Sequence, residues 1–157
     1  MTSTSALKQA VVGVLTANLP ALVAAQSLPP INEFLGYEPG LLSPAKAPQV
    51  WVTLAEQLPG GPAGFGGANA SHTRTRRVLV GVTVADNAQS EVEDRLLAYA
   101  DLIQALLISN PTMGGQASQI RWKGTAYGAN MSRSLTALHK QAVLTFDLDR
   151  WSVLGED

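Results

Sequence analysis

The sequence predicts an α+β fold: a mainly antiparallel sheet of about four strands, with one helix packed across one face and a further helix at the N-terminus. An amphipathic stretch at residues 90–110 is typical of a helix that covers a sheet. The stretches on either side of it, residues 76–86 and 140–151, alternate apolar and polar residues like strands. Neighbouring strands joined by loops favour antiparallel pairing. We therefore expect a single domain that spans residues 1–157.

The first expected element is a helix over residues 5–18, whose apolar stripe consists of Leu7, Val11, Val14 and Leu15. Pro20 is expected to kink this helix or to begin a new turn. The same region is apolar enough to suggest a signal peptide, but Lys8 is its only positive charge and polar residues interrupt the run. We expect neither a cleaved signal nor a membrane span, since a span needs about 18 uninterrupted apolar residues.

Residues 27–48 contain five prolines, too many for regular structure, and are expected to form an extended connector. The connector is nevertheless apolar, because it contains Ile31, Phe34, Leu35, Tyr37, Leu41 and Leu42. We expect these side chains to lie against the domain or against a neighbouring subunit.

A strand is expected at residues 49–55, followed by a flexible glycine-rich loop at 57–73. Phe65 is the single apolar aromatic residue of the loop. The loop lacks the Lys-Ser/Thr pair of a phosphate-binding loop, and a strand follows it, so that no helix N-terminus would face an anion. Contact with another protein is therefore favoured over nucleotide binding.

The next strand is expected to place Val78, Val80, Val82 and Val84 on one face. The helix after it is expected to begin with a capping box of Ser90 and Glu93, and to end before Pro111. Its core stripe consists of Val92, Leu96, Tyr99, Ile103 and Leu106.

Two further strands are expected near the C-terminus, one around residues 117–127 and one that begins near Leu138. In the former, Ile120 and Trp122 face opposite to Arg121 and Lys123. In the latter, the core-facing residues are expected to be Ala142, Leu144, Phe146 and Leu148, which leaves Asp147 and Asp149 on an exposed face.

Composition and motifs give little support to catalysis. The net charge of −1 does not indicate nucleic-acid binding, and the absence of cysteine excludes thiol chemistry. His72 and His139 have no metal-ligand spacing, and no GxSxG motif is present. We therefore expect no catalytic residue, no metal and no cofactor. The basic cluster of Arg74, Arg76 and Arg77 is typical either of a contact with phosphate or an acidic partner, or of a solvated strand end.

The order of these elements, with the segments VWVTLA, SNPTMGG and LTFDLDRW, resembles the tail terminator proteins of long-tailed bacteriophages over residues 7–151. The long connector and the glycine-rich loop depart from that pattern. The resemblance implies a subunit of a six-membered ring that caps the tail tube, ends tail polymerisation and leaves a channel for DNA. The implied partners are further copies of the chain, the tail tube protein and the head-tail connector, with no membrane. The implied location is the head-proximal end of the virion tail, after synthesis in the host cytoplasm.

The residues expected at the subunit or tube interface are Ile31, Phe34, Leu35, Tyr37, Leu41, Leu42, Phe65, Arg74, Arg76 and Arg77. Two alternatives stay open. One is a head-tail connector, head-closure or minor tail protein. The other is a small soluble enzyme or ligand-binding domain, with a site formed by the glycine-rich loop, His72, Arg74 and Arg76.

Overall fold

The computed structural model describes residues 4–39, 47–58, 71–86, 89–130 and 138–153. The elements within these ranges follow one another as α1 (Thr4–Ala25), β1 (Glu33–Leu35), β2 (Gln49–Leu58), β3 (Ser71–Asp86), α2 (Gln89–Ile108), η2 (Met113–Gly115), β4 (Gln119–Asn130) and β5 (Leu138–Val153). The five strands form one sheet in the order β1-β2-β3-β5-β4. All neighbouring strands pair in antiparallel fashion except β1 and β2, which are parallel. The α+β prediction is confirmed, with one strand more than expected.

The additional strand, β1, lies in the connector for which no regular structure was predicted, and that prediction is wrong for Glu33–Leu35. Three contacts hold the connector against the start of β2. The backbone N–H of Asn32 donates to the carbonyl oxygen of Pro48 at 2.9 Å, and its side-chain Nδ2 donates to the carbonyl oxygen of Ala47 at 2.7 Å. Gln49 Nε2 donates to Glu33 Oε2 at 2.5 Å. A strand of three residues is too short to show a period of two in the sequence.

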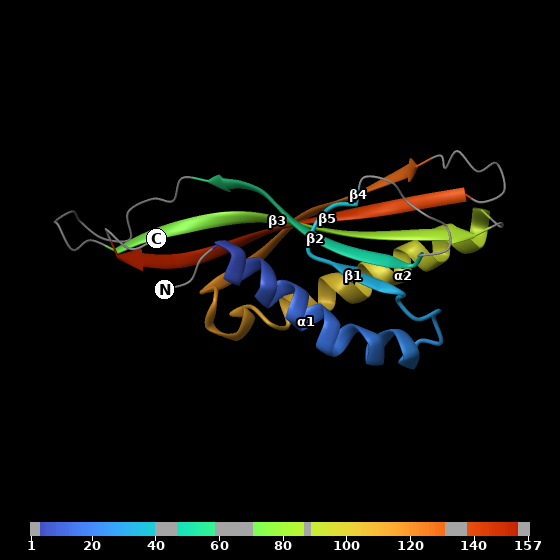
Figure 1. Cartoon of the computed structure of the whole chain (residues 1–157), viewed down its shortest axis with the longest axis horizontal. Helices are drawn as coiled ribbons and strands as arrows, with labels where there is room; N and C mark the ends of the chain where they lie inside the picture. Colours follow the sequence, from blue (N-terminus) through green and yellow to red (C-terminus); the bar gives the residue numbers. More distant parts are fainter. Residues whose placement is uncertain (1–3, 40–46, 59–70, 87–88, 131–137, 154–157) are drawn as a thin grey trace.

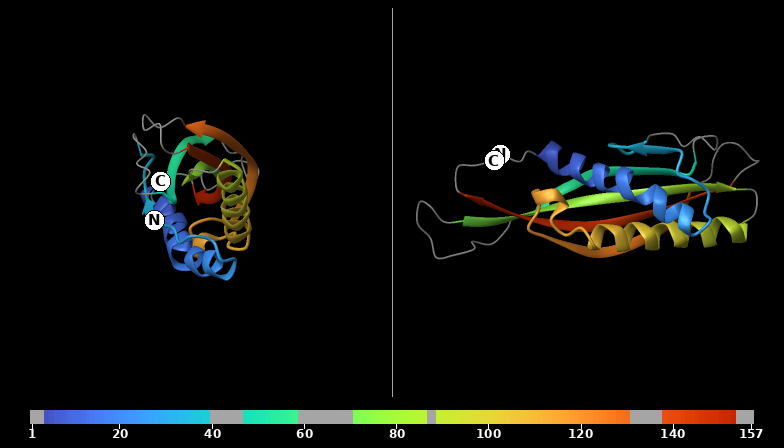
Figure 2. Two further views of the ribbon diagram at one scale, coloured as in Figure 1. Left: turned by 90° about the vertical axis from the view of Figure 1, so that its right-hand side faces the viewer. Right: turned by 90° about the horizontal axis from the view of Figure 1, so that it is seen from below.

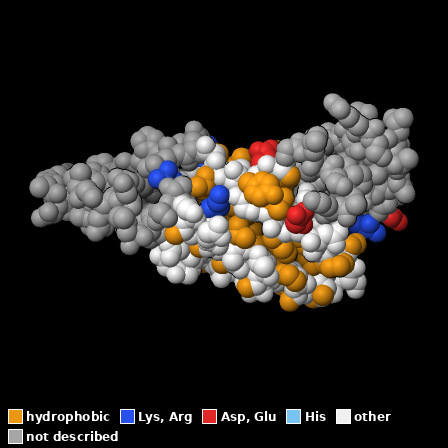
Figure 3. All heavy atoms as spheres, in the orientation of Figure 1, with side chains coloured by type: hydrophobic (Ala, Val, Ile, Leu, Met, Phe, Trp, Pro, Cys, Tyr) orange, Lys and Arg blue, Asp and Glu red, His pale blue; other side chains and the backbone are white. Residues whose placement is uncertain are grey.

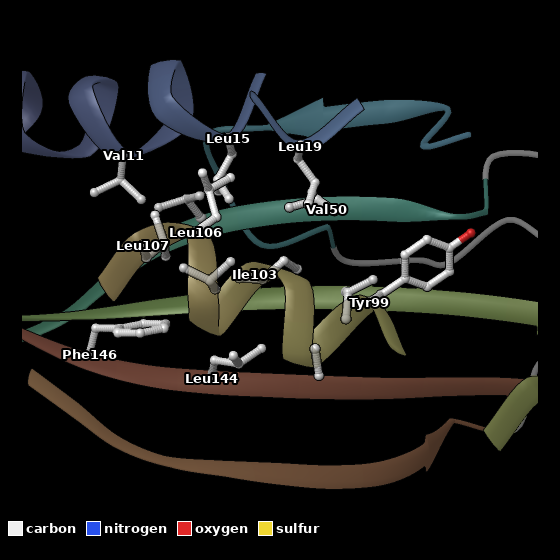
Figure 4. Close-up of a cluster of buried hydrophobic side chains, with 14 of the residues drawn as sticks. Val11, Leu15, Leu19, Val50, Tyr99, Ile103, Leu106, Leu107, Leu144 and Phe146 are labelled. Carbon is white, nitrogen blue, oxygen red and sulfur yellow. The ribbon is translucent and has the colours of Figure 1, made fainter. Parts of the chain in front are cut away.

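Both helices lie on the same side of the sheet (Figures 1 and 2). The core is formed where they meet alternate residues of the central strands, and Figure 4 shows part of this cluster. The predicted core faces are confirmed, because these residues are all buried: Val78, Val80, Val82, Val84, Ala142, Leu144, Phe146 and Leu148. The paired ends of β3 and β5 extend beyond the helices, on the left of Figure 1.

Helix α2 buries the predicted stripe, since Val92, Leu96, Tyr99, Ile103 and Leu106 are all buried. It ends at Ile108, and Asn110 Nδ2 then donates to the carbonyl oxygen of Leu106 at 2.9 Å, which satisfies one of the free carbonyls of the last turn. The hydroxyl of Tyr99 donates to the carbonyl oxygen of Pro29 at 2.5 Å. Helix α2 therefore holds the connector as well as the sheet.

Helix α1 is longer than predicted, because it continues through Pro20 to Ala25. The alternative of a new start at Pro20 is therefore wrong, and the kink stays a prediction. A proline costs a helix one backbone hydrogen bond, and burial of the side chains on both sides of it offsets that cost. The residues of the buried stripe recur at steps of four, and are Leu7, Val11, Leu15, Leu19 and Val23. The segment Ser5–Ala25 is long and apolar enough to cross a membrane by length and composition alone, but this stripe belongs to the protein core.

Candidate subunit interface

Strand β4 is an outer strand of the sheet and pairs along only one of its edges, with β5. In the described part of the chain, its other edge has no strand partner. The strand is 12 residues long, so a row of backbone N–H and C=O groups is left for another chain to pair with. Long edges of this kind are usually blocked or covered in soluble proteins.

A β-bulge interrupts β4 at Lys123. Trp122 and Gly124 face consecutive residues of β5, so Lys123 is an extra residue without a partner opposite it. Gly124 has a φ of +150°, which a residue with a side chain adopts only with strain. The bulge shifts the alternation, and places Thr125 and Tyr127 on the same face as Trp122. The indole Nε1 of Trp122 accordingly donates to the hydroxyl of Thr125 at 3.1 Å.

That face of β4 is apolar and exposed. It is the face on which the helices pack, but Trp122 is 43% exposed and Tyr127 is 51% exposed. Leu97 of α2 is 47% exposed. A pocket of about 290 Å³ lies between α2 and the end of the sheet, and is lined by Glu93, Leu96, Leu97, Tyr127, Gly128 and Lys140.

The pocket has an apolar part and a charged part. The apolar part is formed by two leucines and the ring of Tyr127. The charged part is an ion pair between Lys140 Nζ and Glu93 Oε1. Ligand sites for small molecules usually measure about 300–1,000 Å³, so this pocket is at the lower limit of that range. Its size and chemistry suit one amphipathic side chain rather than a cofactor.

A second polar cluster lies on the sheet face away from the helices. Arg77 Nε donates to Asp147 Oδ1 at 2.9 Å and its Nη2 donates to Asp147 Oδ2 at 3.2 Å. Asp149 Oδ1 accepts from the Thr75 hydroxyl at 2.6 Å and from Arg121 Nη2 at 2.9 Å. Both carboxylates are buried, so the prediction that they form an exposed face is wrong. The alternation of β5 correctly placed both carboxylates on the face away from the helices. They are buried there because side chains of β3 and β4 bond to them.

Of the interface residues predicted from sequence, the described ones belong to two segments, residues 31–37 and strand β3. Ile31 and Phe34 are half-buried and pack against the core, and Leu35 is also half-buried. Tyr37 is 61% exposed, the largest value among the exposed large hydrophobic side chains of the described residues. Arg74, Arg76 and Arg77 lie on β3, where Arg77 is held by Asp147. The remaining three, Leu41, Leu42 and Phe65, lie outside the described residues.

Sequence reasoning missed the exposed apolar residues Leu97, Trp122 and Tyr127. The sequence indicated part of this surface, because Lys123-Gly124 interrupts the alternation of side chains in β4. Viewed as in Figure 1, the described surface carries many hydrophobic and few charged side chains (Figure 3). Among the residues that the structure describes, no group of three or more His, Cys, Asp or Glu residues is arranged to hold a metal ion.

Comparisons with known proteins find similarity among solved structures. No protein-family model matches the chain, and no curated protein matches it. Among solved structures, a chain of a structure described as the virion of a native gene transfer agent particle is similar, with a TM-score of 0.35 and 14% identity. The match covers 91% of this chain and 94% of that chain. At this identity and TM-score the match assigns neither a fold nor a function to the chain.

Proposed function

We propose that the chain is a structural, non-catalytic virion protein that forms a ring on the end of a phage tail tube. The ring ends tail polymerisation and joins the tail to the head connector. The sequence resemblance to tail terminator proteins supports this proposal. The structural observation that carries it is the open edge of β4, with exposed Trp122 and Tyr127 beside it.

This edge favours an assembly role for a physical reason. A long unpaired strand with apolar side chains promotes association, so a chain that keeps one benefits from a partner that covers it. The two outer strands of the sheet, β1 and β4, differ in length and sequence. A contact between two such different edges is heterologous, and repeated heterologous contacts form a closed ring when the rotation between subunits closes.

The ring would act through its surfaces rather than through chemistry. One face would match the last ring of the tail tube, and the opposite face would lack the surface that adds the next tube subunit. Growth of the tube would then end at this ring. The opposite face would meet the head connector, and DNA would pass through the centre.

The first experiment measures the mass of the purified protein by light scattering and native mass spectrometry, alone and with tail tubes assembled from the parent virus's tube protein. Six copies of the 16.5 kDa chain would give a species of about 99 kDa. Electron microscopy should show rings with an open centre, or added density confined to one tube end. A monomer at all concentrations that ignores the tubes would contradict the proposal.

The same images separate the two roles within the virion. Density on tube ends supports a terminator, whereas rings that bind only the head connector support a connector or head-closure protein. No observation on the described residues favours an enzyme over these structural roles.

A further inference from the structure

We propose that the pocket between α2 and β4 receives Tyr37 from a second copy of this chain, and that β1 of that copy lies along the open end of β4. This inference rests on the proposed function, because it specifies the contact that builds the ring. The contact gives a role to the pocket and to the exposed Tyr37, neither of which has an evident role in the fold of a single chain.

The pocket fits a tyrosine by its chemistry. The ring of a tyrosine would lie against the apolar part formed by Leu96, Leu97 and Tyr127. Its hydroxyl would reach the charged part, where the carboxylate of Glu93 accepts hydrogen bonds. Tyrosines bury an apolar ring and keep a polar end hydrogen-bonded, and they are enriched at interfaces for this reason.

Tyr37 is suited to act as the anchor from the partner. The residue is 61% exposed and follows β1 by two positions, at the edge of the sheet opposite to β4. A residue at this position can enter the pocket of a neighbouring copy only if the β1 edge of one copy meets the β4 edge of the other. A head-to-tail ring brings opposite edges together.

The strand directions agree with this contact. Strand β1 runs parallel to β2, and each of the three following pairings in the sheet is antiparallel, so β1 and β4 have opposite directions within one copy. A rotation about an axis that runs along the strands preserves these directions. The β1 strand of the next copy would therefore lie antiparallel to β4.

The distribution of charge along β4 also agrees, because the charged residues Arg121 and Lys123 lie before the bulge or at it. Beyond the bulge, β4 has no charged residue from Gly124 to Asn130. This uncharged half borders the pocket, because Tyr127 and Gly128 line it.

The absence of cysteine from the chain provides a direct test. One preparation carries Tyr37→Cys and the other carries Leu97→Cys, at two exposed positions. The two are mixed under ring-forming conditions and treated with a short bifunctional maleimide. Cross-linked dimers on a denaturing gel should exceed those of a control mixture of Leu22→Cys with Leu97→Cys, in which Leu22 is an exposed residue of α1.

A second variant measures the contribution of the anchor. Tyr37→Ala should raise the dissociation constant of the ring by about 30-fold, as expected for an interface tyrosine at a hot spot, and Tyr37→Phe by less. The urea unfolding midpoint of the single chain should stay unchanged, because Tyr37 is exposed in it.

Each outcome decides between the two proposals. Rings with cross-links no stronger than the control would overturn the Tyr37 contact and leave the ring function intact. A link from Leu97→Cys to the tube protein instead would also overturn it. Cross-links without rings would support the contact and contradict the ring. Neither rings nor cross-links would overturn both.

Discussion

The substitution Gly81→Ala is predicted to destabilise the fold strongly, although it adds only one methyl group. Gly81 of β3 lies opposite Trp51 of β2 in the sheet register. A Cβ atom at Gly81 would lie 1.9, 2.1 and 2.4 Å from three atoms of the Trp51 indole, far inside van der Waals contact. Trp51 is 1% exposed and has little room to move away.

The size of the effect follows from this overlap. Overpacking of a core by one methyl group costs about 1–3 kcal/mol. Complete loss of the packing of a buried tryptophan costs about 3–5 kcal/mol, which sets the upper limit if the ring is displaced. We therefore expect Gly81→Ala to lower the free energy of unfolding by about 3 kcal/mol.

Urea unfolding followed by far-UV circular dichroism measures this loss. Gly13→Ala is the matched control, because a Cβ at that exposed helical position meets nothing within 4 Å and should stabilise α1 by up to about 1 kcal/mol. In a Trp51→Ala background, Gly81→Ala should cost almost nothing, because the clash is gone. A cost below about 1 kcal/mol in the wild type, or equal costs in both backgrounds, would refute the steric explanation.

Two further predictions concern the polar contacts. Arg77→Ala should lower the free energy of unfolding by about 2–4 kcal/mol at neutral pH, because it leaves the buried carboxylate of Asp147 without its cation. Arg121→Ala should cost less, because Arg121 is half-exposed. Equal losses of stability in urea unfolding would contradict this explanation. Burial raises the pKa of Tyr99 from 10.0 to about 12, so the folded state keeps a proton that the unfolded state releases, and stability should fall between these pH values. Tyr99→Phe should cost about 1 kcal/mol at pH 7 through loss of the hydrogen bond to Pro29 and should show a smaller alkaline loss; an unchanged alkaline loss would exclude Tyr99 as its source.

The parts of the fold that were predictable are those with a repeated apolar pattern. Val78 and Leu144 were placed on the core face because a strand alternates its side chains with a period of two. Ile103 was placed in the core because it lies on a stripe of helical period. Such patterns are statements about local geometry, and they hold whenever one side of an element is buried.

The features that were not predictable depend on contacts between distant segments. β1 exists because residues near Asn32 bond to the chain before β2, about 15 residues later. Asp147 and Asp149 are buried because arginines from other strands reach them, and nothing in the local sequence indicates these partners. The exposed residues of the pocket were missed for the same reason, since Leu97 and Tyr127 meet only in the folded chain.

In the proposed ring, the bulge at Lys123 would allow β4 to pair with one partner and resist others. Charged residues and bulges are the devices by which edge strands avoid indiscriminate pairing, and the first half of β4 has both, in Arg121 and Lys123. The second half has neither, and it alone lies beside the pocket. In the proposed contact, the partner that pairs with the second half also places Tyr37 in the pocket, so backbone pairing and side-chain recognition would be coupled. Such coupling favours a single register and a closed ring over open-ended aggregation.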